Sequence, residues 1–142
     1  MSTDIRLLGT DAELHAAWPV MAQLRPAYDA DSFVAQVRRQ MTGGYRLAGC
    51  FRKDAPLSLA GYRYGENLHA GRYMYVDDLV TDEQARGSGA GKALFEWLMA
   101  EAKRNGCVHL SLDSGVQRFA AHRFYLDRGM IISAHHFALT LE

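Results

Sequence analysis

The sequence predicts an α/β domain that mixes strands and helices, and two features of the chain support this. Its 142 residues are the length of one domain, enough to bury about two-thirds of the surface of the unfolded chain. Apolar residues alternate with polar ones in some stretches and recur at helical spacing in others, in an order that interleaves strands with helices. No repeat, linker or low-complexity segment interrupts the chain, so residues 1–142 are expected to form a single domain.

The expected elements follow from these periodicities and from turn residues between them. In chain order they are strand 5–8, helix 11–24, helix 33–41, strands 45–51, 57–64 and 73–81, helix 93–104, strand 108–113, helix 118–128 and strand 130–141. Thr10 is the expected cap of the first helix, and Glu13 completes a capping box. Ser32 is the expected cap of the second helix. Pro19 lies inside the first helix and is expected to kink or split it.

The most informative stretch is a glycine-rich turn at residues 84–92, between a predicted strand and a predicted helix. Gly87, Gly89 and Gly91 allow the backbone to turn tightly and to approach a ligand closely. The first N–H groups of a helix have no partners within the helix, and the helix dipole favours anions there. The turn is therefore predicted to bind a phosphate group.

Spacing excludes the two commonest phosphate-binding motifs. A P-loop requires glycine where Arg86 stands and serine or threonine where Ala93 stands. A dinucleotide-binding fingerprint requires glycine at the position of Lys92. Arg86 and Lys92 instead place a positive charge on each side of the turn.

The remaining motif, Arg86-Gly-Ser-Gly-Ala-Gly91, resembles the pyrophosphate loop Arg/Gln-x-x-Gly-x-Gly/Ala of the GNAT superfamily, the Gcn5-related N-acetyltransferases. A second segment, residues 121–130, is similar to the superfamily's Ala-x-x-Phe/Leu-Tyr-x-x-x-Gly-Phe motif. The predicted order of elements is also that of the superfamily, although only residues 73–130 carry specific motifs. The resemblance implies the GNAT fold: a central, mixed, mostly antiparallel twisted sheet flanked by about four helices.

The resemblance implies acetyl-CoA as the cosubstrate and assigns the residues that contact it. The pyrophosphate would lie on the loop, and the strand before the loop would offer a backbone N–H to the acetyl carbonyl oxygen. Arg118 stands where many members have an asparagine that contacts the pantetheine arm, so it either binds a phosphate or is solvated. The expected cofactor-binding residues are Leu79, Val80, Thr81, Arg86, Gly87, Ser88, Gly89, Ala90, Gly91, Lys92 and Arg118.

Three residues are candidates for catalysis. By resemblance, Tyr125 is the general acid that protonates the departing thiolate. Asp77 and Asp78 are candidates for the base that removes a proton from the acceptor, because they match an acidic pair in the polyamine acetyltransferase branch. In an ideal strand two adjacent residues point to opposite faces, so one of them would meet the core unless a bulge intervened. The alternative is that both carboxylates are solvated or hydrogen-bonded structural groups.

The predicted function is transfer of an acetyl group from acetyl-CoA to a primary amine by direct attack in a ternary complex. A small-molecule amine is favoured as acceptor over a protein N-terminus or lysine. The competing hypotheses are a non-catalytic acyl-CoA-binding or regulatory module, and a fold that binds an unrelated nucleotide.

Composition predicts few other partners. The formal net charge is +0, whereas nucleic-acid-binding proteins usually carry a basic excess. The sequence has neither an apolar run of membrane-spanning length nor a signal-like N-terminus, so a cytoplasmic protein is expected. Cys50 and Cys107 are predicted to be buried free thiols. His135 and His136 are strand neighbours that point apart, and no metal site is expected.

The last thirteen residues predict a homodimer. Residues 131–141 contain no Gly, Pro, Asn or Asp to form a hairpin, whereas GNAT domains usually end in two strands. One long apolar strand would expose an edge that soluble proteins cover or pair. Pairing with a second subunit in two-fold symmetry would cover that edge; the alternative is a monomer with this strand buried in its own sheet.

Overall fold

A computed structural model describes residues 2–142, which pack as two compact units. The first unit extends to Ser111 and the second is Leu112–Glu142. The strands and helices are, in chain order, β1 (Asp4–Leu8), α1 (Asp11–Met21), α2 (Ala30–Thr42), β2 (Arg46–Arg52), β3 (Ala55–Asn67), β4 (Gly71–Thr81), the short 3-10 helix η1 (Glu83–Ala85), α3 (Ala90–Arg104), β5 (His109–Leu112) and α4 (Phe119–Asp127). Every element predicted before residue 129 is present, with bounds a few residues from those expected.

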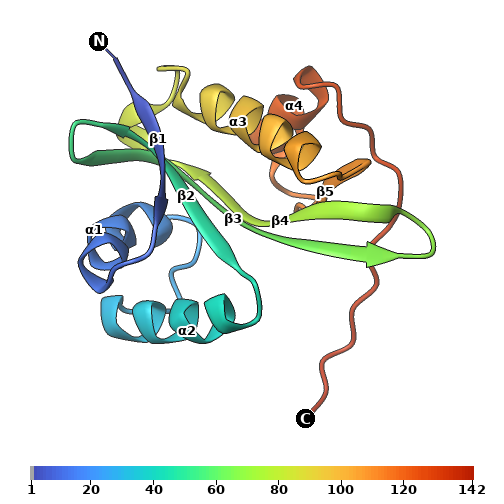
Figure 1. The fold of residues 1–142 in the computed structure, drawn as a ribbon, viewed down its shortest axis with the longest axis horizontal. Coiled ribbons are helices and arrows are strands. Elements are labelled where there is room, and N and C mark those ends of the chain that lie inside the picture. Colours follow the sequence, from blue (N-terminus) through green and yellow to red (C-terminus); the bar gives the residue numbers. More distant parts are fainter. Residues whose placement is uncertain (1) are drawn as a thin grey trace. The chain divides into compact units, whose positions relative to one another are not determined.

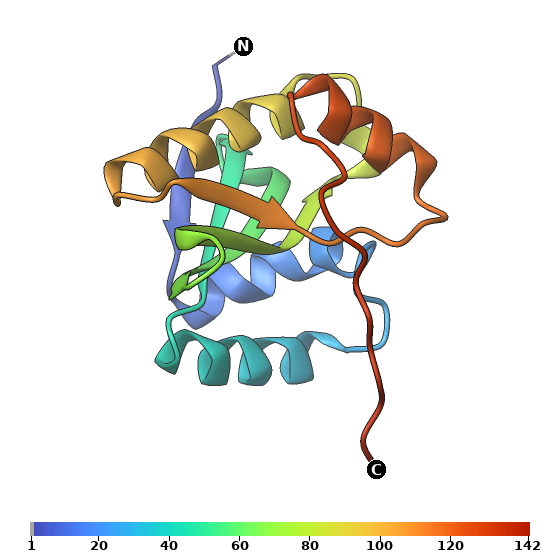
Figure 2. The same ribbon diagram turned by 90° about the vertical axis from the view of Figure 1, so that its right-hand side faces the viewer.

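The strands form one five-stranded sheet in the order β1-β2-β3-β4-β5. The first four strands are successive antiparallel neighbours, and β5 joins β4 after the crossover through α3. Helices α1 and α2 cover one face of the sheet and α3 covers the other (Figures 1 and 2). A mixed, mostly antiparallel sheet, as expected from the sequence, is confirmed.

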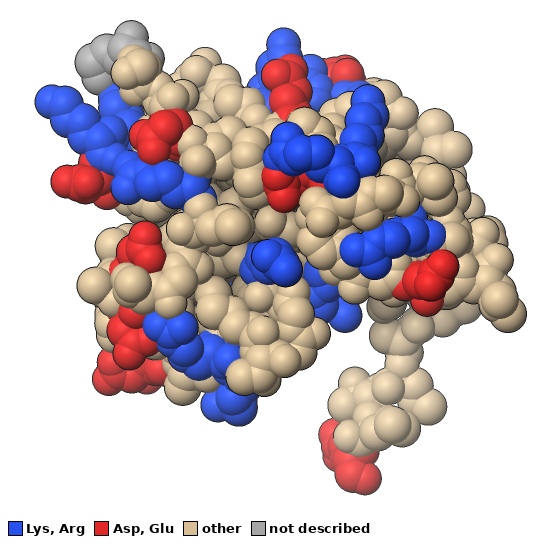
Figure 3. Space-filling model, in the orientation of Figure 1, with Lys and Arg blue, Asp and Glu red and all other residues tan. Residues whose placement is uncertain are grey.

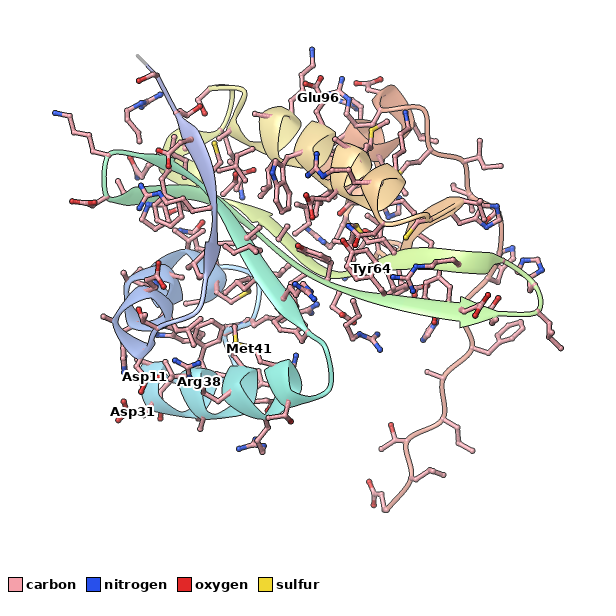
Figure 4. All side chains as sticks on the ribbon, viewed as in Figure 1. Asp11, Asp31, Arg38, Met41, Tyr64 and Glu96 are labelled. Carbon is pink, nitrogen blue, oxygen red and sulfur yellow. The ribbon has the colours of Figure 1, made fainter. Side chains whose placement is uncertain are left out.

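Apolar side chains fill the space on both faces of the sheet. The core under α1 and α2 includes Leu14, Phe33 and Leu47, which are all buried. A salt bridge between Arg38 and Asp11, 2.6 Å from Nη2 to Oδ1, joins the two helices at their exposed side (Figure 4). On the other face, α3 buries a stripe of residues at helical spacing, namely Leu94, Phe95, Leu98 and Ala102.

The caps of α1 and α2 differ in how well the sequence predicts them. Thr10 and Glu13 form the expected capping box at α1. At α2 the expected cap, Ser32, is wrong: the helix begins one turn earlier and Asp29 is the cap. The Asp29 carboxylate accepts from the Ser32 N–H at 2.8 Å, and the Ser32 hydroxyl accepts from the Asp29 N–H at 2.9 Å. Serine at the third helical position thus completes a capping box in place of glutamate.

The end of the chain contradicts the expected strand at 130–141. Residues 130–142 form neither helix nor strand, and the apolar side chains of Ile131, Ile132, Phe137, Leu139 and Leu141 are exposed. Alternation of apolar residues gives the segment strand propensity, but a strand exists only where a neighbouring backbone takes up its hydrogen bonds. Those partners are not present in the described chain.

Two bulges interrupt the sheet, and one of them lies in β4. The register passes from Tyr62 opposite Val76 to Gly61 opposite Asp78, so Asp77 is an extra residue on β4. A bulge of this kind shifts the alternation of side chains by one position. Asp77 and Asp78 are therefore not forced to opposite faces of the sheet.

Gly61 allows a close approach beside this bulge. A Cβ atom at Gly61 would overlap the Tyr45 hydroxyl, and the Tyr45 ring is itself buried with 3% of its surface exposed. The glycine thus leaves the space in which the phenol lies across β3.

Replacing this glycine tests the packing. Gly61→Ala should lower the free energy of unfolding by about 1–3 kcal/mol, because the buried Tyr45 ring has to move. Chemical denaturation followed by circular dichroism measures the change. Gly9→Ala is the matched control, since a Cβ atom there has no neighbour within 4 Å. Equal stability of the two variants would show that the Tyr45 ring adjusts without cost.

Candidate functional site

The predicted phosphate-binding loop lies between the end of β4 and the start of α3. Gly87 and Gly89 both adopt left-handed backbone conformations, with φ of 80° and 89°. Glycine takes up this conformation without the steric penalty that a side chain incurs. Gly89 is also the residue that caps α3, and no side chain hydrogen-bonds to the helix end from that position.

The start of α3 therefore presents free hydrogen-bond donors. The Ala90 N–H reaches the Ser88 hydroxyl at 3.3 Å, and the first intrahelical bond, from Ala93 to Gly89, is 2.9 Å long. The N–H groups of Gly91 and Lys92, between these two, have no acceptor among the described residues. Together with the helix dipole, such donors form an anion site.

The end of β4 leads into this loop along an edge that β5 does not reach. Leu79, Val80 and Thr81 pair with β3 on one side. On the other side, β5 begins beside the start of β4, where the Val108 N–H bonds to the Arg72 carbonyl at 2.9 Å. Because β5 has four residues, it does not extend to the end of β4. The backbone of residues 79–81 is thus free of β5 along that edge.

The bulge brings the two aspartates to one face of the sheet. Arg63 Nε and Nη2 donate to the Asp77 carboxylate at 2.7 and 2.8 Å. Arg25 Nε donates to Asp78 Oδ1 at 2.8 Å, and its Nη2 donates to the backbone carbonyl of Asp77 at 2.9 Å. Each carboxylate is thus neutralised by an arginine, and Arg25 links the two.

A buried tyrosine holds the second aspartate in place. The Tyr45 hydroxyl donates to Asp78 Oδ2 at 2.7 Å. Burial of the ring, and next the negative charge of Asp78, raise the pKa of Tyr45 well above its usual value of 10. The phenol therefore remains a donor, and both oxygens of Asp78 are occupied.

A hollow of about 520 Å³ opens beside these groups, within the size range of small-molecule sites. Its lining residues are Arg25, Tyr28, Gln36, Gln40, Gly43, Arg63, Asp77 and Asp78. A smaller, more apolar hollow of about 60 Å³ adjoins it between α1, α2 and Tyr45. The arrangement offers an amine both carboxylate acceptors and an apolar floor.

Tyr125 and Arg118 both belong to the second compact unit. Tyr125 lies on α4, half-buried, with its ring 5.9 Å from that of Phe124. Arg118 precedes α4 as its cap residue. The roles of both residues toward a bound cofactor are predictions from the sequence.

Sequence reasoning did not identify Arg25, Arg63 and Tyr45 as neighbours of the aspartates. Arg25 lies in the turn after α1, Arg63 lies in β3 and Tyr45 directly precedes β2, and no motif connects them. Gly61 offered one signal, since glycine inside a strand often marks a close approach of another group.

Four further observations concern the surface charge, metal binding, membrane-spanning helices and the cysteines. Acidic and basic side chains are interspersed over the face shown in Figure 3. Within residues 2–142 no group of three or more His, Cys, Asp or Glu residues could hold a metal ion. None of the described helices combines the length and the apolar character needed to cross a membrane. Both cysteines are free thiols, but Cys107 is only partly buried.

The proteins that resemble this chain include two N-acetyltransferases and a solved structure. An uncharacterised N-acetyltransferase of Bacillus subtilis (strain 168), YhdJ, is 30% identical over 135 residues, which cover 94% of this chain and 95% of the relative. The aminoalkylphosphonate N-acetyltransferase of Salmonella typhimurium is 30% identical over 86 residues, 60% of this chain and 54% of the relative.

The third is a solved structure, the aminoglycoside N-acetyltransferase AAC(6')-Iy in complex with the bisubstrate analogue CoA-S-monomethyl-acetylneamine. It superposes with a TM-score of 0.87 at 12% identity, over 100% of this chain and 99% of that one. At this identity the likeness shows the fold, which is the GNAT fold. Residues 12–130 match the acetyltransferase (GNAT) family, and the chain belongs to that family.

Proposed function

We propose that the protein transfers the acetyl group of acetyl-CoA to the primary amine of a small molecule, by direct attack in a ternary complex. The observation that carries the proposal is the left-handed Gly87–Gly89 turn, which opens α3 with free N–H donors at the end of β4. In this proposal the CoA pyrophosphate binds those donors, and Arg86 and Lys92 add positive charge. The acetyl arm extends along the free edge of residues 79–81.

Different residues are proposed to assist different steps of acetyl transfer. The amine nitrogen attacks the thioester carbonyl carbon, the C–S bond breaks, the nitrogen loses a proton and the thiolate gains one. A backbone N–H of residues 79–81 stabilises the negative charge that develops on the carbonyl oxygen. Tyr125 donates the proton to the sulfur, because a phenol and a thiol have pKa values close enough for transfer, about 10 and 8.5.

Two observations support a small-molecule acceptor. The hollow beside Asp77 and Asp78 has the volume of a small-molecule site. The names of two similar proteins specify small amines, an aminoalkylphosphonate and an aminoglycoside. A protein N-terminus or lysine is the alternative acceptor. Use of acetyl-CoA, an intracellular metabolite, is consistent with a cytoplasmic location.

Asp77 and Asp78 are proposed to receive the amine. Each of them already accepts hydrogen bonds from an arginine, and Asp78 accepts a further one from Tyr45. Carboxylates whose charge is neutralised in this way are better suited to anchoring an ammonium group than to removing its proton. We therefore propose that the pair anchors the ammonium group, in place of the role as base expected from the sequence, and that water carries the proton away.

The loop assignment predicts the effect of one substitution. Gly89→Val should abolish acetyl-CoA binding, because valine is strained at a φ of 89° and its side chain would stand where the backbone meets the phosphates. Isothermal titration calorimetry measures the affinity. Gly106→Val is the matched control: Gly106, after the other end of α3, has a φ of 76° and open space around it. Retained affinity in folded Gly89→Val would contradict the assignment.

The role of Tyr125 predicts a second effect. Tyr125→Phe should lower kcat about a hundredfold or more and leave the KM for acetyl-CoA nearly unchanged, since only the proton donor is lost. Steady-state release of CoA measures both constants. Tyr64→Phe is a suitable control, because the buried Tyr64 hydroxyl has no hydrogen-bond partner among the described residues. An effect confined to KM would make Tyr125 a binding residue.

We also propose a homodimer that covers the exposed apolar side chains of residues 131–141. Phe137, for example, is 92% exposed, and soluble proteins rarely leave a run of such residues uncovered. Light scattering should give about twice the chain mass of 15.9 kDa at tens of micromolar. Phe137→Lys should return the mass to that of one chain, whereas a wild-type mass of one chain would refute the dimer.

A further inference from the structure

The hollow beside the bulge contains two positive and two negative side chains. Arg25 pairs with Asp78 and Arg63 pairs with Asp77, and the other residues that line the hollow are uncharged. A site for a simple cationic amine would need only the carboxylates. The two guanidinium groups in the same hollow therefore call for an explanation.

The four charged groups are not held equally firmly. The side chains of Asp78 and Asp77 are 15% and 24% exposed, whereas those of Arg25 and Arg63 are 46% and 51% exposed. Asp78 is also fixed by the buried Tyr45 hydroxyl. The arginines are long side chains with many rotamers, and ion pairs at this exposure contribute little to stability. The carboxylates are thus fixed acceptors, and the guanidinium groups are able to move to a ligand.

We propose that the acceptor is zwitterionic: a primary amine that carries a carboxylate or phosphate group a few bonds away. This inference rests on the proposed acetyltransferase function and names its substrate class. The ammonium group replaces the Arg25 guanidinium at Asp78. The anionic group receives the released Arg25 guanidinium and adjoins Arg63, which keeps its bonds to Asp77. Every charge in the hollow then remains paired, in the complex as in the free protein.

Other amines do not satisfy this condition. A monoamine without an anionic group would displace one arginine and leave its guanidinium without a counter-charge. A diamine would add a second positive charge beside Arg25 and Arg63. In both cases positive groups lie side by side without a counter-charge, and like charges at short range repel. The hollow therefore favours acceptors that bring one charge of each sign.

The geometry also indicates which end of the acceptor lies where. Asp78 adjoins Leu79, the first residue of the free β4 edge along which the acetyl arm is proposed to lie. Both guanidinium groups donate hydrogen bonds to Asp77: Arg63 donates to its carboxylate and Arg25 donates to its backbone carbonyl. Planar guanidinium forks match carboxylate and phosphate oxygens. The amine therefore lies toward Asp78 and the anion on the side of Arg63.

Matched acceptors test the inference. β-Alanine, phosphoethanolamine, propylamine and 1,3-diaminopropane all carry a primary amine on a short chain and differ in the charge at the other end. Release of CoA from acetyl-CoA gives kcat/KM for each. At least one of the two zwitterions should exceed propylamine by about tenfold or more, and the diamine should rank lowest. Comparison of β-alanine with phosphoethanolamine distinguishes a carboxylate acceptor from a phosphate acceptor.

Two variants test whether Arg63 recognises the anionic group of the acceptor. Arg63→Gln should raise KM for the preferred zwitterion about tenfold and should not lower kcat/KM for propylamine, because the Asp77 carboxylate that loses Arg63 can pair with its ammonium group. Arg38→Gln removes an equal charge from an exposed salt bridge with Asp11, outside the hollow, and should change neither. Circular dichroism and the affinity for acetyl-CoA show that both variants remain folded.

The measurements distinguish failure of the zwitterion inference from failure of the proposed acetyltransferase function. Propylamine or the diamine as the best acceptor, or an Arg63→Gln effect equal for all amines, would overturn the zwitterion inference and leave the acetyltransferase function intact. If no amine is acetylated, calorimetry decides: an absence of acetyl-CoA binding overturns the proposed function. If acetyl-CoA binds but neither zwitterion binds to the CoA-saturated protein, this inference is overturned alone.

Discussion

The β-bulge at Asp77 is the constraint on which the site depends. With regular alternation, Asp78 would lie on the face of β4 that buries Met74 and Val76 under α3, and an uncompensated charge there would be very costly. The extra residue places both carboxylates on the α1–α2 face instead. Two adjacent negative charges then require counter-charges, and two arginines, from the turn after α1 and from β3, supply them.

The consequences of the bulge extend into the core. Arg25 follows α1, so its bonds to Asp78 and to the Asp77 carbonyl fix the end of that helix against β4. Gly61 lies opposite Asp78 in the β3–β4 register. Tyr45 reaches Asp78 only because Gly61 has no side chain. The residues that contact the bulged pair of aspartates thus come from the neighbouring strand, from the position before β2 and from the turn after α1. The same strand ends at the glycine turn, so both halves of the site depend on β4.

Local features of the sequence predicted the fold and the position of the glycine turn well, because their causes are local. The spacing of Gly87 and Gly89 and the box formed by Thr10 and Glu13 depend on residues a few positions apart. The ion pairs depend on contacts between distant segments: Arg25 lies 53 positions from Asp78. The expected final strand was wrong for a related reason, since β propensity cannot supply the neighbouring backbone that a strand requires. The bulge was foreseen only as a condition for the aspartates to share a face.

The paired charges also bear on how the acceptor becomes reactive. At pH 7 an alkylamine with a pKa of about 10.4 is almost entirely protonated, and freeing its lone pair costs roughly 4–5 kcal/mol. A carboxylate without a cationic partner would stabilise the ammonium form of the acceptor. The free-energy cost of removing its proton would then be higher. In the proposed binding mode Arg25 competes with the ammonium for Asp78, so the guanidinium can return to the carboxylate as the proton leaves. Tyr45 keeps Asp78 in position throughout, because its raised pKa keeps the phenol protonated. An acceptor site in which each carboxylate already has a cationic partner therefore binds the ammonium form loosely and does not oppose its conversion to the nucleophile.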